Sequence, residues 1–146
     1  MIELILIRHA HAGPYTLPDE ARKLSSQGLE EARQLKPKLK GMPEGHWLVS
    51  SVVRTRQTFE LISESSAEFS ESWYHASGPA YLEMIQERSE KVIYLVAHNP
   101  SISYLASYFS GEQIQMETAN CVHLQWPTLD SWKEVTRGSA IVQTRI

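Results

Sequence analysis

The chain has 146 residues, the size of one ordinary domain, and no internal repeat or low-complexity block indicates more than one. Its 14 Lys and Arg against 17 Asp and Glu give a formal net charge of -3, which argues against a nucleic-acid or acidic-membrane partner. The single cysteine, Cys121, excludes an internal disulfide framework and fits a reducing compartment. The first apolar run, residues 4–7, is too short for a signal-peptide core or a membrane span. We therefore expect a single cytoplasmic domain over residues 1–146.

The first half of the chain alternates predicted strands and helices. "IELILI" (2–7) is typical of a central strand that is buried on both faces. Apolar residues recurring every three or four positions predict an amphipathic helix over 25–40, with one of the two serines at its start as the N-cap. A second short apolar run at 46–50 predicts a strand, and 53–66 predicts a second helix.

The second half continues this alternation. A weak strand is predicted at 70–77, a third helix at 77–88, the clearest strand at 92–97 and a fourth helix at 100–109. Such an order of strands and helices implies a mainly parallel sheet with helices on both faces.

The last two predicted strands differ from the others. Residues 120–126 and 139–146 alternate polar and apolar side chains, and a turn-rich stretch separates them, so they predict a hairpin at one edge of the sheet. The expected fold class is therefore α/β: a three-layer α/β/α sandwich with a mainly parallel central sheet and an edge hairpin.

Cationic side chains follow three of the predicted strands. Arg8 and His9 come directly after the first strand, Arg54 comes shortly after the second, and His98 directly follows 92–97. Ligands of open α/β sheets bind outside the carboxyl ends of the strands, so these side chains are expected at one rim. Arginine offers paired donors to phosphate, and a neutral imidazole can attack phosphorus while a second one, if protonated, stabilises the developing charge. The pattern indicates a phosphate site.

Four motifs between residues 4 and 102 resemble the histidine phosphatase (phosphoglycerate-mutase-like) superfamily. "LIRHA" is similar to its Arg-His-Gly signature, "SSVVRTRQT" to its Ser-Pro-x-x-Arg-Ala-x-Gln-Thr segment, and "VAHNPSI" to its second-histidine motif. "ARKLSSQG" resembles the Arg-Pro-Leu-Thr-x-x-Gly element of the small SixA-type phosphohistidine phosphatases. The chain departs from these patterns at Ala10, Lys23, Ser51 and Thr55, and no departure removes a group that the chemistry needs.

The resemblance implies a phosphatase that works through a covalent phosphohistidine intermediate. It implies His9 as the catalytic nucleophile and His98 as the second catalytic histidine of the phosphate pocket. Arg8 and Arg54 would clamp the phosphate, and Arg22 would be a further phosphate-binding arginine. Neither a metal nor another cofactor is implied.

The resemblance also bears on the substrate. Larger members of the superfamily carry a glutamate that protonates the leaving oxygen, whereas here Glu83 and Glu87 are predicted to lie on a solvated helix face. Ester hydrolysis benefits from a positioned acid. The lack of such an acid therefore favours, as the substrate, phosphohistidine on a protein, such as a phosphotransfer domain. The alternatives are a phosphomonoesterase for a small sugar or nucleotide phosphate, and a noncatalytic phosphoprotein-binding domain. Neither nucleic acid nor a membrane is an expected partner.

Two arginine assignments have competing interpretations. Arg54 and Arg56 point some 200° apart on a helix, so only one can face the pocket, and the motif selects Arg54. Arg22 stands beside Asp19 and Glu20, where it could instead form an ordinary surface ion pair.

Several other polar residues near the motifs also remain open. "HAH" places His11 two residues after His9, as in some zinc hydrolases, but no second ligand-spaced cluster follows. Asn99 would cap a helix with Pro100 at its first position, and Ser101 could donate to phosphate or serve as the cap. The remaining histidines predict surface or strand-packing roles: His46, His75 and His123.

Overall fold

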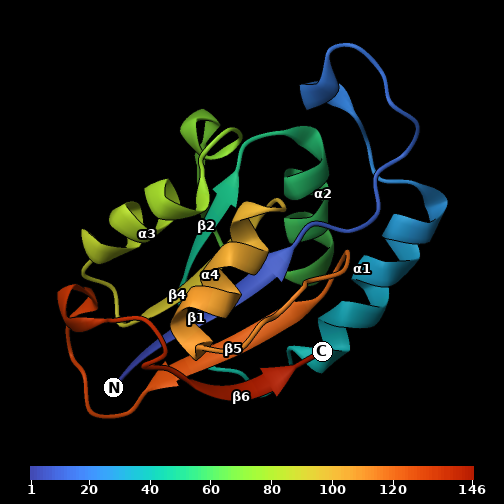
Figure 1. Ribbon diagram of the computed structural model, residues 1–146. Helices are drawn as coiled ribbons and strands as arrows, with labels where there is room; N and C mark the ends of the chain where they lie inside the picture. The colour runs from blue at the N-terminus through green and yellow to red at the C-terminus, as the bar shows by residue number, and fades with distance from the viewer.

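The computed structural model describes residues 1–146, and its six strands form one sheet (Figure 1). The strands are β1 (Ile2–Arg8), β2 (His46–Ser50), β3 (Ala67–Ser70), β4 (Val92–Ala97), β5 (Cys121–Trp126) and β6 (Ile141–Arg145), in the order β3-β2-β4-β1-β5-β6. The four strands from β3 to β1 are mutually parallel, whereas β5 runs antiparallel to β1 and β6 antiparallel to β5. The predicted mainly parallel sheet with an edge hairpin is confirmed.

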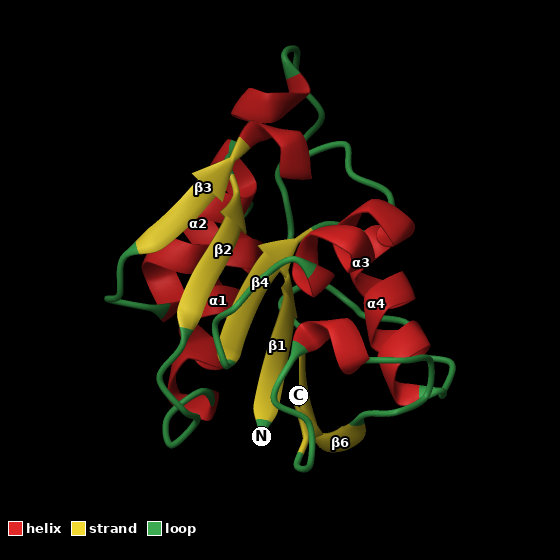
Figure 2. Cartoon of the chain, turned by 90° about the vertical axis from the view of Figure 1, so that its left-hand side faces the viewer, coloured by secondary structure: helices red, strands yellow, loops and turns green.

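Four α-helices cover the two faces of the sheet (Figure 2). They are α1 (Ser26–Lys38), α2 (Val53–Ile62), α3 (Gly78–Gln86) and α4 (Ser101–Ser110). Successive side chains of a strand point to opposite faces, so Ile5 and Ile7 pack in the cluster with α1 and α2, while Leu4 and Leu6 pack in the cluster with α3 and α4. The three-layer α/β/α arrangement is therefore also confirmed. No helix is of a length and apolarity that would cross a membrane.

Helix α1 begins where a serine caps it. The Ser25 hydroxyl accepts a hydrogen bond from Gly28 N at 3.0 Å, which satisfies a backbone donor of the first turn. A Cβ atom added at Gly28 would lie 2.0 Å from the His11 carbonyl oxygen. Glycine at this position therefore lets the start of α1 pack directly against the chain that leaves β1.

The prediction of a strand at 70–77 is wrong. β3 ends at Ser70, and a 3-10 turn follows at Glu71–Trp73, in which the Ser70 hydroxyl accepts from Ser72 N. The turn carries Trp73 into the core beneath α3, and that burial outweighs the extended preference of the segment. Helix α2 also ends four residues earlier than predicted, because Ser63 adopts an extended conformation.

The start of α4 differs by one residue from the prediction. The helix begins at Ser101, with Pro100 at its N-cap position. Asn99 still satisfies the helix start, because its Oδ1 accepts from Ser103 N at 3.3 Å and from Ser103 Oγ at 2.6 Å. Asn99 also donates from Nδ2 to Met116 O at 2.9 Å, and this bond ties the end of β4 to the segment before β5.

Candidate active site

The carboxyl ends of β1 and β4 bring the two predicted catalytic histidines together. In the parallel register Arg8 pairs with Ala97, so the residues that follow, His9 and His98, leave the sheet side by side. His9 N donates to Ala97 O at 3.1 Å, and the two imidazole centroids are 5.3 Å apart. Both side chains are almost fully buried.

A cavity of about 280 Å³ opens at this edge of the sheet. Its lining comes from the ends of β1 and β4, the start of α2 and the two long loops that follow β1 and α4: Arg8, His9, His11, Ala12, Arg22, Arg54, His98, Asn99 and Thr118. The structure thus places all five residues predicted for the site around one cavity, although they are spread over ninety residues of sequence.

The geometry of His9 leaves one ring nitrogen free. Its Nδ1 lies 2.7 Å from the Ala10 carbonyl oxygen, which can only accept, so Nδ1 carries the proton and Nε2 bears the lone pair. Burial, and then the positive charges of Arg54 and Arg8, lower the pKa of His9 to about 4. His9 is therefore a neutral imidazole at pH 7, which is the form that can act as a nucleophile.

His98 is also neutral at pH 7, so it does not supply the positive charge that a protonated second imidazole would bring to the site. Burial, followed by the nearby His9 and Arg54, lowers its pKa to about 3. Its Nε2 lies 2.8 Å from Ser50 Oγ, while Nδ1 is buried and has no hydrogen-bond partner. Tyr74 packs edge-on against the ring, with centroids 5.6 Å apart.

Three buried side-chain nitrogen atoms of the structure lack a hydrogen-bond partner, and all three belong to residues that line this cavity. They are Nε of Arg8, Nε of Arg22 and Nδ1 of His98. The other ends of the two guanidinium groups are held in place, Arg8 by Met116 O at 3.0 Å and Arg22 by Gly13 O at 2.9 Å. Buried polar atoms are rarely left unpaired in proteins, so their convergence indicates a site for a ligand rich in acceptor oxygens.

The carboxylate of Asp19 binds two of the arginines that line the cavity. Asp19 accepts from Arg54 Nη2 at 3.0 Å and from Arg22 Nη1 at 3.2 Å, and the Tyr74 hydroxyl also donates to it. The Tyr74 hydrogen bond, together with the bonds from the two arginines, lowers the pKa of Asp19 to about 2. Arg22 is therefore an ion-pair partner and a cavity-lining residue at once.

Sequence reasoning did not assign a site role to Asp19 or Tyr74. The only available signal for Asp19 was its spacing of three residues from Arg22. Nothing in the sequence linked Tyr74, at the end of a 3-10 turn, to a loop 55 residues away.

Two of the open interpretations are decided by geometry. Arg56 turns away from the cavity: its Nε donates to Ser51 O at 2.8 Å and its guanidinium group lies 4.0 Å from the Phe69 ring centroid. Ser101 neither caps α4 nor lines the cavity, because its hydroxyl donates to Ala76 O at 2.6 Å.

The remaining histidines show no metal-site geometry. His11 is exposed, with Nδ1 2.7 Å from Ser25 Oγ, and the structure contains no group of three or more His, Cys, Asp or Glu that could hold a metal ion. His46 pairs with Glu68 at 2.9 Å, and the buried His123 pairs with Glu3 at 2.9 Å. The exposed His75 packs against the ring of Tyr74.

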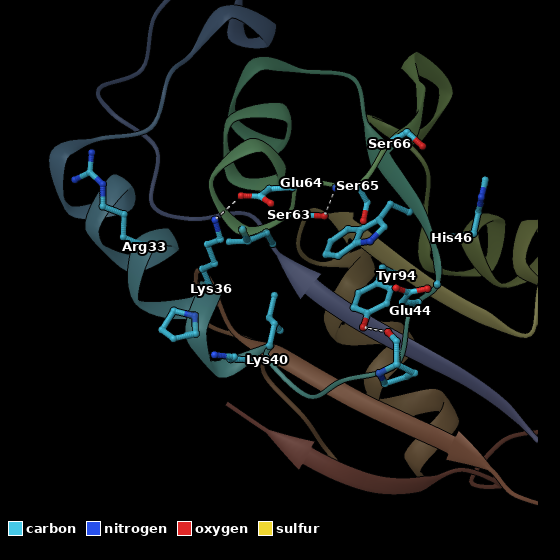
Figure 3. Close-up of a pocket in the computed structure, with 16 residues that line it drawn as sticks. Arg33, Lys36, Lys40, Glu44, His46, Ser63, Glu64, Ser65, Ser66 and Tyr94 are labelled. Atoms are coloured by element: carbon cyan, nitrogen blue, oxygen red, sulfur yellow. Dashed lines mark hydrogen bonds and ion pairs between the residues drawn. The ribbon is translucent and has the colours of Figure 1, made fainter.

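A larger hollow, of about 950 Å³, lies at the opposite end of β2 and contains none of the predicted site residues. Figure 3 shows Lys36 turned toward Glu64, at 3.5 Å, and Tyr94 bonded through its hydroxyl to Pro43 O. The carboxyl ends of α1 and α2 border this hollow, and helix carboxyl ends disfavour anions. The smaller cavity around His9 is therefore the candidate active site.

Comparisons with known proteins bear on the sequence and on the fold of the chain. The model of the histidine phosphatase superfamily (branch 1) matches residues 4–74. No curated protein sequence matches the chain.

Among solved structures, a putative phosphohistidine phosphatase SixA from Agrobacterium tumefaciens aligns with a TM-score of 0.84 at 19% identity, over 99% of this chain and 97% of the other. A putative SixA from Nakamurella multipartitia aligns with a TM-score of 0.79 at 23% identity, over 99% of this chain and 95% of the other. The protein histidine phosphatase SixA complexed with tungstate aligns with a TM-score of 0.78 at 22% identity, over 99% of this chain and 96% of the other.

The matched motifs and the shared fold confirm the predicted resemblance to the histidine phosphatase superfamily. In its overall fold, the chain is similar to the solved structures of SixA-type proteins.

Proposed function

We propose that the protein is a phosphatase that forms a covalent phosphohistidine on Nε2 of His9. The observation that carries the proposal is the set of three unpartnered buried nitrogens, on Arg8, Arg22 and His98, beside a neutral imidazole with a free lone pair. Donors aimed at phosphoryl oxygens stabilise the charge of the transition state, and they cost little reorganisation when they are already in place.

The reaction would proceed in two displacements. In the first, a bond forms between His9 Nε2 and phosphorus while the bond from phosphorus to the leaving atom breaks, and the leaving group takes up a proton. In the second, water attacks the phosphohistidine, inorganic phosphate leaves, and His9 returns to its neutral state. Because Nδ1 of His9 remains bonded to Ala10 O, the ring keeps its orientation through both steps.

The preferred substrate in this proposal is phosphohistidine on a protein. The exposed Glu83 lies on α3 and the exposed Glu87 at its C-cap position, and neither lines the cavity, so neither is placed to protonate a leaving alkoxide. A leaving imidazole is protonated more easily and needs that acid less. The cavity volume of about 280 Å³ suits a phosphoryl group, and the rest of the substrate would lie outside it.

The SixA structures among the structural neighbours support this choice, whereas other neighbours are named as phosphatases of phosphoserine or of alpha-ribazole-5'-P. Three neighbours carry the SixA phosphohistidine phosphatase name, and one of these is complexed with tungstate, a tetrahedral oxyanion like phosphate. A cytoplasmic location stays a prediction from the sequence.

The covalent step is tested by rapid-quench labelling with a phosphohistidine-bearing phosphotransfer domain as donor. We expect an acid-labile, alkali-stable adduct on wild-type protein and no adduct on the His9→Ala variant. His11→Ala is the matched control, since it removes the neighbouring imidazole, and it should still be labelled. Labelling that persists in His9→Ala would contradict the proposal, and an unlabelled wild type that still binds phosphate would favour the noncatalytic binding domain.

The substrate class is tested by comparing kcat/KM for the phosphotransfer domain with that for sugar and nucleotide monophosphates. We expect the phosphoprotein to be the better substrate by at least about 100-fold, since a positioned acid is worth roughly 10²- to 10⁴-fold in ester hydrolysis. A monoester that reacts as well as the phosphoprotein would favour the phosphomonoesterase.

We further propose that residues 1–146 act as one domain. The activity should need no metal, because three guanidinium groups already supply positive charge at the cavity. Dialysis against EDTA should leave the activity unchanged. Activity lost on dialysis and restored by zinc would contradict this proposal.

A further inference from the structure

Ser50 does not line the active-site cavity, but its hydroxyl contacts His98, which does. It is the last residue of β2, its side chain is fully buried, and its Oγ lies 2.8 Å from His98 Nε2. The Thr55 hydroxyl donates to the Ser50 carbonyl oxygen, and this bond fixes the backbone at that point.

The hydroxyl proton of Ser50 has one acceptor within reach. Among the hydrogen bonds of the structure, His98 Nε2 is the only partner of Ser50 Oγ, and the side chain has no access to water. If His98 carried its proton on Nε2, the serine proton would be buried without an acceptor, which is energetically unfavourable. The alternative arrangement, in which Ser50 donates and Nε2 accepts, satisfies both groups.

The same choice decides what His98 offers to a ligand. With Nε2 accepting from Ser50, the proton of the neutral ring resides on Nδ1, which is the nitrogen without a protein partner. An N–H at this position donates to a phosphoryl oxygen, whereas a lone pair there would repel it. We propose that Ser50 is a positioning residue that holds His98 in the Nδ1–H tautomer and so makes its free nitrogen a donor to the phosphoryl group.

A hydroxyl suits this role better than a carboxylate would. It orients the imidazole without adding a negative charge beside a cavity built for an anion. It can also reverse its role, since it can accept from Nε2–H if the bound phosphate draws a second proton onto the ring. The tautomer itself does not depend on the proposed function, whereas the effect on rate rests on it.

The tautomer is measured directly by two-bond 1H–15N correlation spectra of histidine-labelled protein at pH 7, with the His98 signals assigned by comparison with His98→Gln. We expect wild-type His98 to be protonated on Nδ1 and unprotonated on Nε2. A wild-type His98 protonated on Nε2 would overturn the proposal, whether or not the protein proves to be a phosphatase.

The consequence for rate is measured with Ser50→Ala, and Ser51→Ala is the matched control because Ser51 is adjacent and its hydroxyl makes no hydrogen bond. We expect Ser50→Ala to lower kcat by about 10- to 100-fold, less than the roughly 10²- to 10³-fold that deletion of a donor costs, and to shift His98 toward a tautomer mixture. Ser51→Ala should change neither. A Ser50→Ala protein with wild-type kcat and an unchanged Nδ1–H tautomer would overturn the proposal.

Discussion

At the scale of single residues, the site combines neutral bases with fixed positive charges. His9 and His98 are neutral because they are buried beside each other and beside Arg54. The guanidinium groups cannot lose their protons at any ordinary pH, so they bear the positive charge that attracts a phosphate dianion. The division leaves His9 free to attack and assigns electrostatic binding to the arginines.

Arg54 and Arg56 provide a matched pair for testing this division. Arg54 lines the cavity, while Arg56 stacks on Phe69 outside it. Because a hydrogen bond to a charged group is worth roughly 1.5–3 kcal/mol, Arg54→Ala should raise the inhibition constant of vanadate by about 10- to 100-fold. Arg56→Ala should leave that constant within about twofold. A larger effect of Arg56→Ala in the competitive inhibition assay would show that the other arginine faces the ligand.

At the scale of elements, the site depends on how closely α1 approaches the end of β1. The chain between them carries His9 and His11 at one end and Arg22 at the other, and the loop rises from the carboxyl edge of the sheet (Figure 1). Gly28 allows the contact, because its backbone packs against the carbonyl group of His11. The motif glycine thus has a packing role in addition to its place in a helix.

Gly28→Ala should therefore destabilise the protein, although alanine is the better helix former. The added methyl group would collide with the His11 carbonyl, and overpacking of this kind costs roughly 1–3 kcal/mol. Ser26→Ala, an exposed substitution in the same helical turn, is the control and should cost less than about 0.5 kcal/mol. Urea unfolding monitored by circular dichroism measures both, and a Gly28→Ala protein more stable than wild type would show that α1 can shift without cost.

At the scale of the whole molecule, the two buried neutral imidazoles link stability to pH. An unfolded chain binds protons at the ordinary histidine pKa of 6.5, whereas folded His9 and His98 bind them only near pH 4 and pH 3. Stability is therefore fully present above about pH 6.5 and falls as the pH drops toward 4, because the unfolded state binds more protons there. At pH 5 each imidazole should cost about 2 kcal/mol of folding free energy.

This linkage predicts that His98→Gln flattens the loss of stability between pH 8 and pH 5 by about half. The measurement is the urea midpoint of wild type and variant at the two pH values. His75→Gln, which removes an exposed imidazole, should keep the wild-type dependence of stability on pH. Equal slopes for wild type and His98→Gln would mean that His98 does not stay neutral in the folded protein.

Patterns of sequence were sufficient to predict the strands that carry the site. The apolar runs 4–7 in β1 and 92–97 in β4 end abruptly at Arg8 and His98, and a run of this kind can be recognised without knowledge of its neighbours. The weaker segment at 70–77 was predicted wrongly, since burial of Trp73 against distant helices decided its conformation. Local preference was too small to compete with that burial.

Sequence by itself determined the order of strands and helices, the edge hairpin and the candidate histidines and arginines, because these follow from hydrophobic periodicity and from motifs contained in short segments. Only the tertiary structure decided that Asp19 holds Arg54 and Arg22, that Tyr74 joins them, and that Ser50 meets His98. These contacts join residues on separate elements, and their partners are set by strand register and helix packing. Burial then lowers the pKa of both histidines, which is a property of the folded environment and not of the residue type.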